Sequence, residues 1–395
     1  MSIWKRVKSA LFGGEDAPST PATREGEHVG FSAPRPDLAG QPPAWIDAAE
    51  SPFGVRALDV RPITLGTLSA SKDPVMASNA VSYGGETGRS FAAQRPQSAR
   101  VAAITLRYRA PEGVHDGALF IPTEMEDKWA LFVVEAELLL VRSWRREVLL
   151  RAPMTLEGDE VVIGPPRGFV CREDEGDAYT RRALDFILRT HALELPWPAP
   201  LLPDGGDDPR ARALECMSMF GRSAHYASHD EPAAEPPERP LRAMTPLHLA
   251  AMRGDLAGVD AALAAGTPAR LKDRFGRGAL HYADRSPAVL ARLLEAGASL
   301  DDPADDGTTV LMYATQARRG DSVRALLERG AEAGLADARG FTALHRAAEM
   351  GEVEVAKALL AHGANPDAIA EGDHTPRSLA AMRGQTAITA LFTTN

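Results

Sequence analysis

Two neighbouring segments of the chain hold its densest group of residues that could do acid–base chemistry, 122–129 (PTEMEDKW) and 141–148 (VRSWRREV). The charges that could face each other across two adjacent strands are Glu124, Glu126 and Lys128 on the first and Arg142, Arg145 and Arg146 on the second. As an active site, this arrangement would supply a general acid or base and arginines for an anion. The same pattern is typical of a cross-strand charge ladder around Trp129 and Trp144. We favour the ladder and assign no catalytic residue.

Other chemical motifs are weaker. The sequence has no nucleophile elbow, P-loop, HExxH or CxxC motif. His191 at a predicted helix end and His225 are isolated, and the two cysteines, Cys171 and Cys216, have no metal-ligand spacing with histidines. The sequence therefore predicts neither a metal site nor a cofactor.

The segment 44–228 that must position these residues predicts an α+β domain with a mainly antiparallel sheet. Apolar runs bounded by short polar turns predict strands at 56–64, 100–109, 117–122, 129–142 and 146–163. The long run WALFVVEAELLLVRSW favours two strands joined by a tight turn near 135–137. Helical periodicity predicts helices at 178–190 and 208–227.

Three further segments flank this domain. Residues 1–14 have an amphipathic helical pattern around Trp4, which predicts either a weak membrane-surface or partner-docking helix, or a terminus that packs or frays. Residues 15–43 are rich in Pro, Gly and charge and predict a disordered linker. Residues 229–240 form a Pro- and Glu-rich connector, and 241–395 form the last unit.

The bulk composition narrows the class of protein. A formal net charge of −10 argues against a general nucleic-acid binder, which needs a basic face. Two cysteines in 395 residues favour a reducing compartment, and no signal peptide is visible, so the sequence predicts a cytoplasmic location. The Ala-, Arg- and Pro-rich composition is typical of a GC-rich bacterial genome.

The C-terminal third repeats itself. The segments TPLHLA, GALHYA, TVLMYA, TALHRA and TPRSLA start at residues 245, 278, 309, 342 and 375. Each of the first four is followed by an apolar pair and a glycine at 266, 297, 330 or 363. A threonine suits the helix cap, proline suits the first helical turn, and glycine ends the second helix. No such unit buries its apolar face alone, so the copies must stack.

This pattern resembles the ankyrin-repeat family over about 155 of the 395 residues, most closely from Asp337 to Asp367. The resemblance implies an all-α solenoid of five repeats that binds a protein partner. It also implies that His248, His281 and His345 are hydrogen-bonding bridges between repeats. Repeat two is shortened around residues 284–287, repeat three has Met312 in place of histidine, and the polar, truncated fifth repeat suits a cap.

The resemblance places the binding surface on the concave face, at hairpin tips 272–277, 302–306 and 337–341 and on the first helices. The candidate partner-binding residues are Lys272, Arg274, Phe275, Arg277, Tyr282, Tyr313, Arg318, Arg339, Phe341, Arg346 and Met350. Exposed aromatic and arginine side chains are frequent anchors of protein interfaces.

The sequence is compatible with several functions. We favour an adaptor or inhibitor that holds a protein through the array. The alternatives are an enzyme with a catalytic α+β domain and the array as substrate selector, a membrane-surface regulator tethered by residues 1–14, and an immunity protein of bacterial conflict. The pattern identifies neither the partner nor the oligomeric state.

Overall fold

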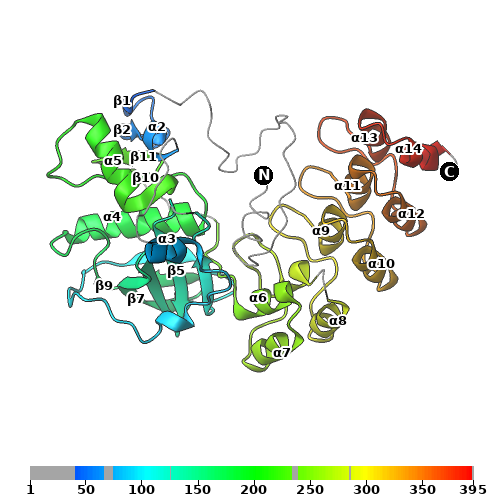
Figure 1. Cartoon of the computed structure of the whole chain (residues 1–395), viewed down its shortest axis with the longest axis horizontal. Helices are drawn as coiled ribbons and strands as arrows, with labels where there is room; N and C mark the ends of the chain where they lie inside the picture. Colours follow the sequence, from blue (N-terminus) through cyan, green and yellow to red (C-terminus); the bar gives the residue numbers. More distant parts are fainter. Residues whose placement is uncertain (1–40, 66–73, 125, 234–238, 284–285, 394–395) are drawn as a thin grey trace. The chain divides into compact units, whose positions relative to one another are not determined.

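The computed structural model describes residues 41–65, 74–124, 126–233, 239–283 and 286–393 (Figure 1). The predictions for residues 1–14, for 15–40 of the linker and for 284–285 of repeat two lie outside these residues. The chain divides between Ala243 and Met244 into two compact units. Leu241 and Ala243 pack in the core of the first unit, although the sequence assigned them to the array.

The first unit is built on an antiparallel sheet in the order β3-β8-β7-β6-β5-β4, with β9 paired to β7. Its strands are β3 (Leu106–Arg109), β4 (Gly117–Phe120), β5 (Trp129–Val134), β6 (Glu137–Arg142), β7 (Glu147–Glu157), β8 (Glu160–Ile163) and β9 (Arg167–Gly168). Glu135 and Ala136, both with positive φ, form the tight turn expected between β5 and β6. The predicted antiparallel sheet is therefore confirmed.

Both faces of β5 and β6 are buried, which explains their unbroken apolar sequences. Leu131, Val133 and Leu140 point into a core shared with the helices α4 (Asp177–Ile187) and α5 (Pro209–Phe220). Phe132 and Leu139 point into a smaller core on the opposite face. A five-residue π-helical turn, Leu188–Ala192, extends α4 beyond its expected end and buries His191.

A small second sheet in the order β1-β2-β11-β10 completes this unit. Its strands are β1 (Ala44–Ile46), β2 (Ala57–Asp59), β10 (Pro198–Pro200) and β11 (Tyr226–Ser228), and only β10 and β11 run parallel. Two short helices, α2 (Arg61–Thr64) and α3 (Pro74–Val81), lie between β2 and β3 in the sequence.

Three predicted elements were too long. The strand expected at 56–64 stops at Asp59, because Pro62 in the first turn of α2 favours a helix start there. The strand expected at 100–109 covers only β3. The helix expected at 208–227 ends at Phe220, because Gly221 takes φ 73°. A Cβ at Gly221 would lie 1.8 Å from the Glu126 carbonyl oxygen, so this backbone approach requires glycine.

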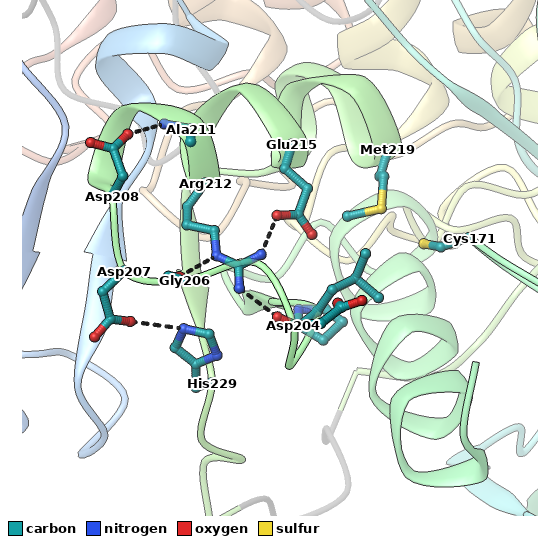
Figure 2. A network of polar contacts seen from close by, with 12 residues as sticks. Cys171, Asp204, Gly206, Asp207, Asp208, Ala211, Arg212, Glu215, Met219 and His229 are labelled. Carbon is teal, nitrogen blue, oxygen red and sulfur yellow. Dashed lines mark hydrogen bonds and ion pairs between the residues drawn. The ribbon is translucent and has the colours of Figure 1, made fainter. Parts of the chain in front are cut away.

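The loop before α5 is held by Arg212, which is 1% exposed (Figure 2). Its guanidinium donates to the carbonyl oxygens of Leu202 at 2.5 Å and Gly206 at 2.7 Å, and it also pairs with Glu215. Asp208 caps α5 by accepting from the Ala211 amide at 2.7 Å. These contacts fix the start of α5, whose far end reaches Met219 beside Cys171 in Figure 2.

The second unit is a row of helical hairpins, with the first helices on one side and the second helices on the other (Figure 1). The first elements of the five repeats are α6 (Pro246–Arg253), a 3₁₀ turn (Ala279–Tyr282), α9 (Val310–Gln316), α11 (Ala343–Met350) and α13 (Pro376–Met382). The second elements are α7 (Leu256–Ala264), α8 (Pro287–Glu295), α10 (Gly320–Glu328), α12 (Val353–Ala361) and α14 (Thr386–Thr393).

The expected caps occur in this unit. Thr245, Thr342 and Thr375 each begin a first helix with a capping box, and Thr309 caps α9. In repeat five, Ser378 replaces the histidine and accepts from the Thr375 amide at 2.9 Å. Repeat two differs, because Gly278 stands at the cap and only a 3₁₀ turn follows.

Candidate functional site

The hairpin tip of repeat two is organised by Asp273, which is completely buried. One carboxylate oxygen accepts from the amides of Phe275 and Arg277, each at 2.9 Å. The other oxygen accepts from the Tyr282 hydroxyl. The Arg274 and Arg277 guanidinium groups lie 4.6 and 4.7 Å from the centre of the Phe275 ring. The tip thus presents a phenyl ring with arginines stacked on it.

The tip of repeat four has the same framework. One oxygen of Asp337 accepts from the amides of Arg339 at 3.0 Å and Phe341 at 2.9 Å. The other accepts from the Arg346 guanidinium at 2.8 Å. The guanidinium groups of Arg339 and Arg346 lie 5.3 and 5.4 Å from the centre of the Phe341 ring.

At equivalent positions of the two tips, one repeat has an aromatic residue where the other has an arginine. Where repeat two has Phe275, Arg277 and Tyr282, repeat four has Arg339, Phe341 and Arg346. The turn aspartates Asp273 and Asp337 are common to both, and the list of candidate residues omitted them. Their signal in the sequence is the Asp-x-x-Gly motif at each tip. Each tip is therefore pre-organised by its own side chains before any partner binds.

Not every candidate is available for contact. Tyr282 and Tyr313 are only 3% and 9% exposed, so the expectation of exposed tyrosine anchors is wrong. Tyr282 is held inward by Asp273, and Tyr313 lies under the Arg277 guanidinium, 4.7 Å from its ring centre. Burial raises the pKa of Tyr313 to about 12. The two tyrosine rings are therefore buried beneath the tip residues Asp273 and Arg277, which they contact.

The remaining candidates lie on the surface or are half-buried. Lys272 donates to the Pro303 carbonyl oxygen at 2.9 Å. Arg318 and Arg339 are exposed and pair with Glu352 and Glu371 of the following repeats. Phe275, Phe341, Arg346 and Met350 are half-buried. The apolar residue Ile369, which the list of candidates omitted, is 70% exposed at the next tip and extends this surface.

The repeated histidines are bridges, as the resemblance implied. His248 Nε2 lies 3.0 Å from the Leu271 carbonyl oxygen, His281 Nε2 lies 3.2 Å from that of Thr308, and His345 Nε2 lies 3.2 Å from that of His374. Burial lowers the pKa of His281 to about 4. Neutral imidazoles can fill this structural role.

The two glutamates of the predicted charge ladder lie before the first strand residue, Trp129. Glu124 pairs with Arg222, and Glu126 is buried. Trp129 pairs with Arg142 in the sheet register, so both glutamates lie before the start of β5. Arg142 instead donates to the Ser218 and Met219 carbonyl oxygens, each at 2.7 Å. Arg145 lies 4.0 Å from Glu147.

Two general features of the described residues bear on function. Within the ranges that the structure describes, His, Cys, Asp and Glu side chains form no group of three that could hold a metal ion. In the same ranges no helix has the length and apolar character to cross a membrane.

Comparison with known proteins agrees with the geometry of the second unit. A family model described as ankyrin repeats (3 copies) matches residues 247–337, 285–370 and 319–394. No family model matches the first unit.

Three curated proteins are similar to about a third of the chain each. The chicken (Gallus gallus) nuclear factor NF-kappa-B p105 subunit is 30% identical over 155 residues, which is 38% of this chain and 16% of that protein. The human neurogenic locus notch homolog protein 1 is 35% identical over 139 residues, 34% of this chain and 5% of that protein. The mouse B-cell lymphoma 3 protein homolog is 35% identical over 131 residues, 31% of this chain and 29% of that protein.

The chain thus spans less than a third of the length of each of these relatives. The repeats and their relatives support a protein-interaction role. The capped hairpins, the histidine bridges and the family match lead to one conclusion: the C-terminal part of this chain belongs to the ankyrin-repeat family.

Proposed function

We propose that the protein is an adaptor or inhibitor that holds a protein partner on the hairpin-tip surface of repeats two to five. The observation that carries this proposal is the pair of arginine–aromatic clusters around Phe275 and Phe341, each fixed by a turn aspartate. Aromatic and arginine residues held in one conformation lose little entropy on binding, which suits them as anchors.

The chemistry of the surface indicates the kind of partner. Arg274, Arg339 and Arg346 present guanidinium groups that match carboxylates, and the phenyl rings between them favour an apolar side chain. Ile369 adds an exposed apolar contact at the end of the row. We therefore expect an acidic partner surface that carries one or two apolar side chains.

Capture by charge-reversed full-length chains tests this surface. Tagged wild type, Arg339→Glu and Ile369→Glu are used to capture proteins from the cells in which this protein occurs, and bound proteins are quantified by mass spectrometry. We expect a stoichiometric partner whose recovery drops at least about tenfold in both variants, as for an interface hot spot.

Matched controls on the second-helix row separate this effect from lost folding. Arg324→Glu changes a 53% exposed arginine of α10, and Leu256→Glu changes a 39% exposed leucine of α7. Both should retain the partner, and all four variants should keep the wild-type circular dichroism spectrum. Equal loss in the control variants, or full retention in the tip variants, would contradict the proposal. Addition of the full chain to the purified partner then separates an inhibitor, which lowers its activity, from an adaptor.

A further inference from the structure

A cavity of about 670 Å³ lies in the first unit, beside the end of α5. Its wall comes from separate parts of the chain: α3, the loop at Gln97, the residue before β5, the end of β6 with the turn that follows, β7, the segment after β9, and α5. This volume is within the range of roughly 300–1,000 Å³ typical of small-molecule sites. The cavity belongs to the unit for which no function has been assigned above.

Most of the wall is apolar, and methionine is frequent in it. The apolar lining residues are Met76, Trp144, Leu149, Phe169, Val170, Leu214, Met217 and Met219. Methionine side chains are flexible and polarizable, so they adapt to ligands of differing shape. Leu214 is 49% exposed, whereas Val170 and Met217 are 3% and 5% exposed. The wall therefore runs from an open end near Leu214 to a buried end.

The charged groups of the wall are mainly cationic. Lys128, Arg142 and Arg145 line the cavity, and Glu147 is the one carboxylate in the described lining. Glu147 already accepts from the Gln97 amide at 2.5 Å and lies 4.0 Å from Arg145. The cationic excess favours an anion inside the cavity.

The three cations of the wall differ in their exposure and in their contacts. Arg142 is committed to the carbonyl oxygens at the end of α5, where it also favours the negative end of the helix dipole. Lys128 is 7% exposed, and its ammonium lies 4.3 Å from the centre of the Trp144 ring. The Arg145 side chain is 66% exposed at the rim. Lys128 and Arg145 can thus approach an anionic head from the inside and from the rim.

We propose that this cavity binds a small amphipathic anion, whose carboxylate or phosphate head lies between Lys128 and Arg145 and whose apolar part packs among the methionines and Leu214. The cationic excess of the wall attracts the anionic head, and the apolar lining removes the apolar part of the ligand from water. The proposal is independent of partner binding by the array, so either can fail without the other.

The protonation of Lys128 supplies a second line of support. Burial, followed by the charge of Arg142, lowers the pKa of Lys128 to about 8, while Glu126 and Asp127 act in the opposite direction. The other titratable groups of the lining are Arg145, Glu147 and Cys171, and burial raises the pKa of the Cys171 thiol to about 12, so it stays neutral. Anion affinity should therefore fall as the pH rises through about 8, where Lys128 loses its charge.

Isothermal titration calorimetry of the full chain tests the proposal with matched probes. Dodecanoate and dodecyl phosphate carry the same apolar chain and distinguish the two heads. Dodecyltrimethylammonium reverses the charge, and acetate lacks the chain. We expect saturable binding of at least one dodecyl anion and at least about tenfold weaker binding of the other two probes.

Variants then locate the binding site. Lys128→Met keeps the length of the side chain and removes its charge, Arg145→Gln neutralises the rim, and Leu214→Glu places a negative charge at the opening. Each should weaken the anion at least about fivefold, and Lys128→Met should abolish the loss of affinity above pH 8.

Controls from the same unit guard against unfolding and non-specific binding. Leu156→Glu changes a leucine that is 48% exposed, nearly the same as Leu214, on β7 away from the cavity lining. Arg107→Gln removes an exposed arginine that pairs with Glu157. Both should bind like wild type, with unchanged melting temperatures for every variant compared. Wild-type affinity in the three cavity variants, equal affinity for the cationic probe, or no binding of either dodecyl anion overturns the proposal.

Discussion

Repeats two and four both fold their tips around an aspartate, Asp273 and Asp337, but only repeat four starts its first helix with a threonine. In repeat four, the Thr342 amide donates to His345 Nδ1 at 3.0 Å, and α11 runs from Ala343 to Met350. In repeat two, Gly278 occupies the same position, and a 3₁₀ turn from Ala279 to Tyr282 takes the place of the helix.

The consequence appears at the bridging histidines. His345 uses both ring nitrogens, one in the capping box and one to the His374 carbonyl oxygen. His281 keeps its bridge to Thr308, but its buried Nδ1 has no hydrogen-bond partner among the described residues. Repeat two thus combines a missing cap hydroxyl with a different helix start, while the bridge between repeats persists. A repeat tolerates a weak local cap because its neighbours supply part of its stability.

Removal of the two histidines should give the largest contrast. We expect His345→Ala to cost about 3–4 kcal/mol and His281→Ala about 2 kcal/mol, because His345 loses more hydrogen bonds in a buried site. Urea titration of the full chain, with hydrogen exchange of peptides from the array, measures both losses. An equal or larger loss for His281→Ala would remove the distinction between the two repeats.

Acid should destabilise repeat two through His281. Because its folded pKa of about 4 lies below the unfolded value of 6.5, the unfolded chain binds more protons between these values. The stabilisation is therefore present above pH 6.5 and is lost as the pH falls toward 4, by about 2 kcal/mol at pH 5. Urea midpoints of wild type and His281→Gln from pH 7.5 to 5 test this. The variant should show a smaller pH dependence, and identical slopes would refute the assignment.

Completion of the missing cap should make repeat two resemble repeat four. The backbone at Gly278 has φ −74°, and an added Cβ would meet only the Leu271 carbonyl oxygen at 3.9 Å. Gly278→Thr should therefore stabilise the array by roughly 0.5–1 kcal/mol, a few tenths of it from the helix cap and the rest from the lost freedom of glycine in the unfolded chain. The gain should shrink in the His281→Ala background, since the hydroxyl would then lack its imidazole neighbour. A destabilised Gly278→Thr chain would show that the shortened turn, and not the cap, sets the 3₁₀ geometry.

Exposed ion pairs between repeats should matter least. Arg270, which follows repeat one, pairs with Asp302, and Arg339 at the tip of repeat four pairs with Glu371 of repeat five. Both pairs lie near the surface. We expect Arg339→Gln to cost no more than about 0.5 kcal/mol and Arg270→Gln to leave the melting temperature unchanged, with any effect reduced further in 1 M salt. Thermal melts at low and high salt provide the measurement. A clear loss of stability in either variant would mean that these pairs hold the stack together.

The tip surface was only half predictable. The tip ranges follow from the spacing of the repeats, since each Asp-x-x-Gly turn lies at a fixed distance from its helix cap. Which side chains are exposed does not follow, because Tyr282 is drawn inward by Asp273 and Tyr313 is covered by Arg277. The repeat pattern does not specify that Tyr282 meets Asp273 or that Tyr313 meets Arg277.

The first unit shows a wider gap between sequence and structure. Alternation and turn residues predicted the hairpin of β5 and β6, but they did not show that β5 begins only at Trp129, after the two glutamates of the proposed charge ladder. The cavity around Lys128 was not foreseen at all. Its lining residues come from segments far apart in the chain, and only the packing of α5 against the sheet brings them together.

The sequence by itself determined the stack of repeats, their caps and their terminal glycines, because each depends on neighbours within about one repeat. The histidine bridges followed from the resemblance to ankyrin repeats. The tertiary structure alone decided which aromatic rings support the tip surface and which residues share the cavity. These are contacts between side chains distant in sequence, and their geometry is set by strand register and helix docking.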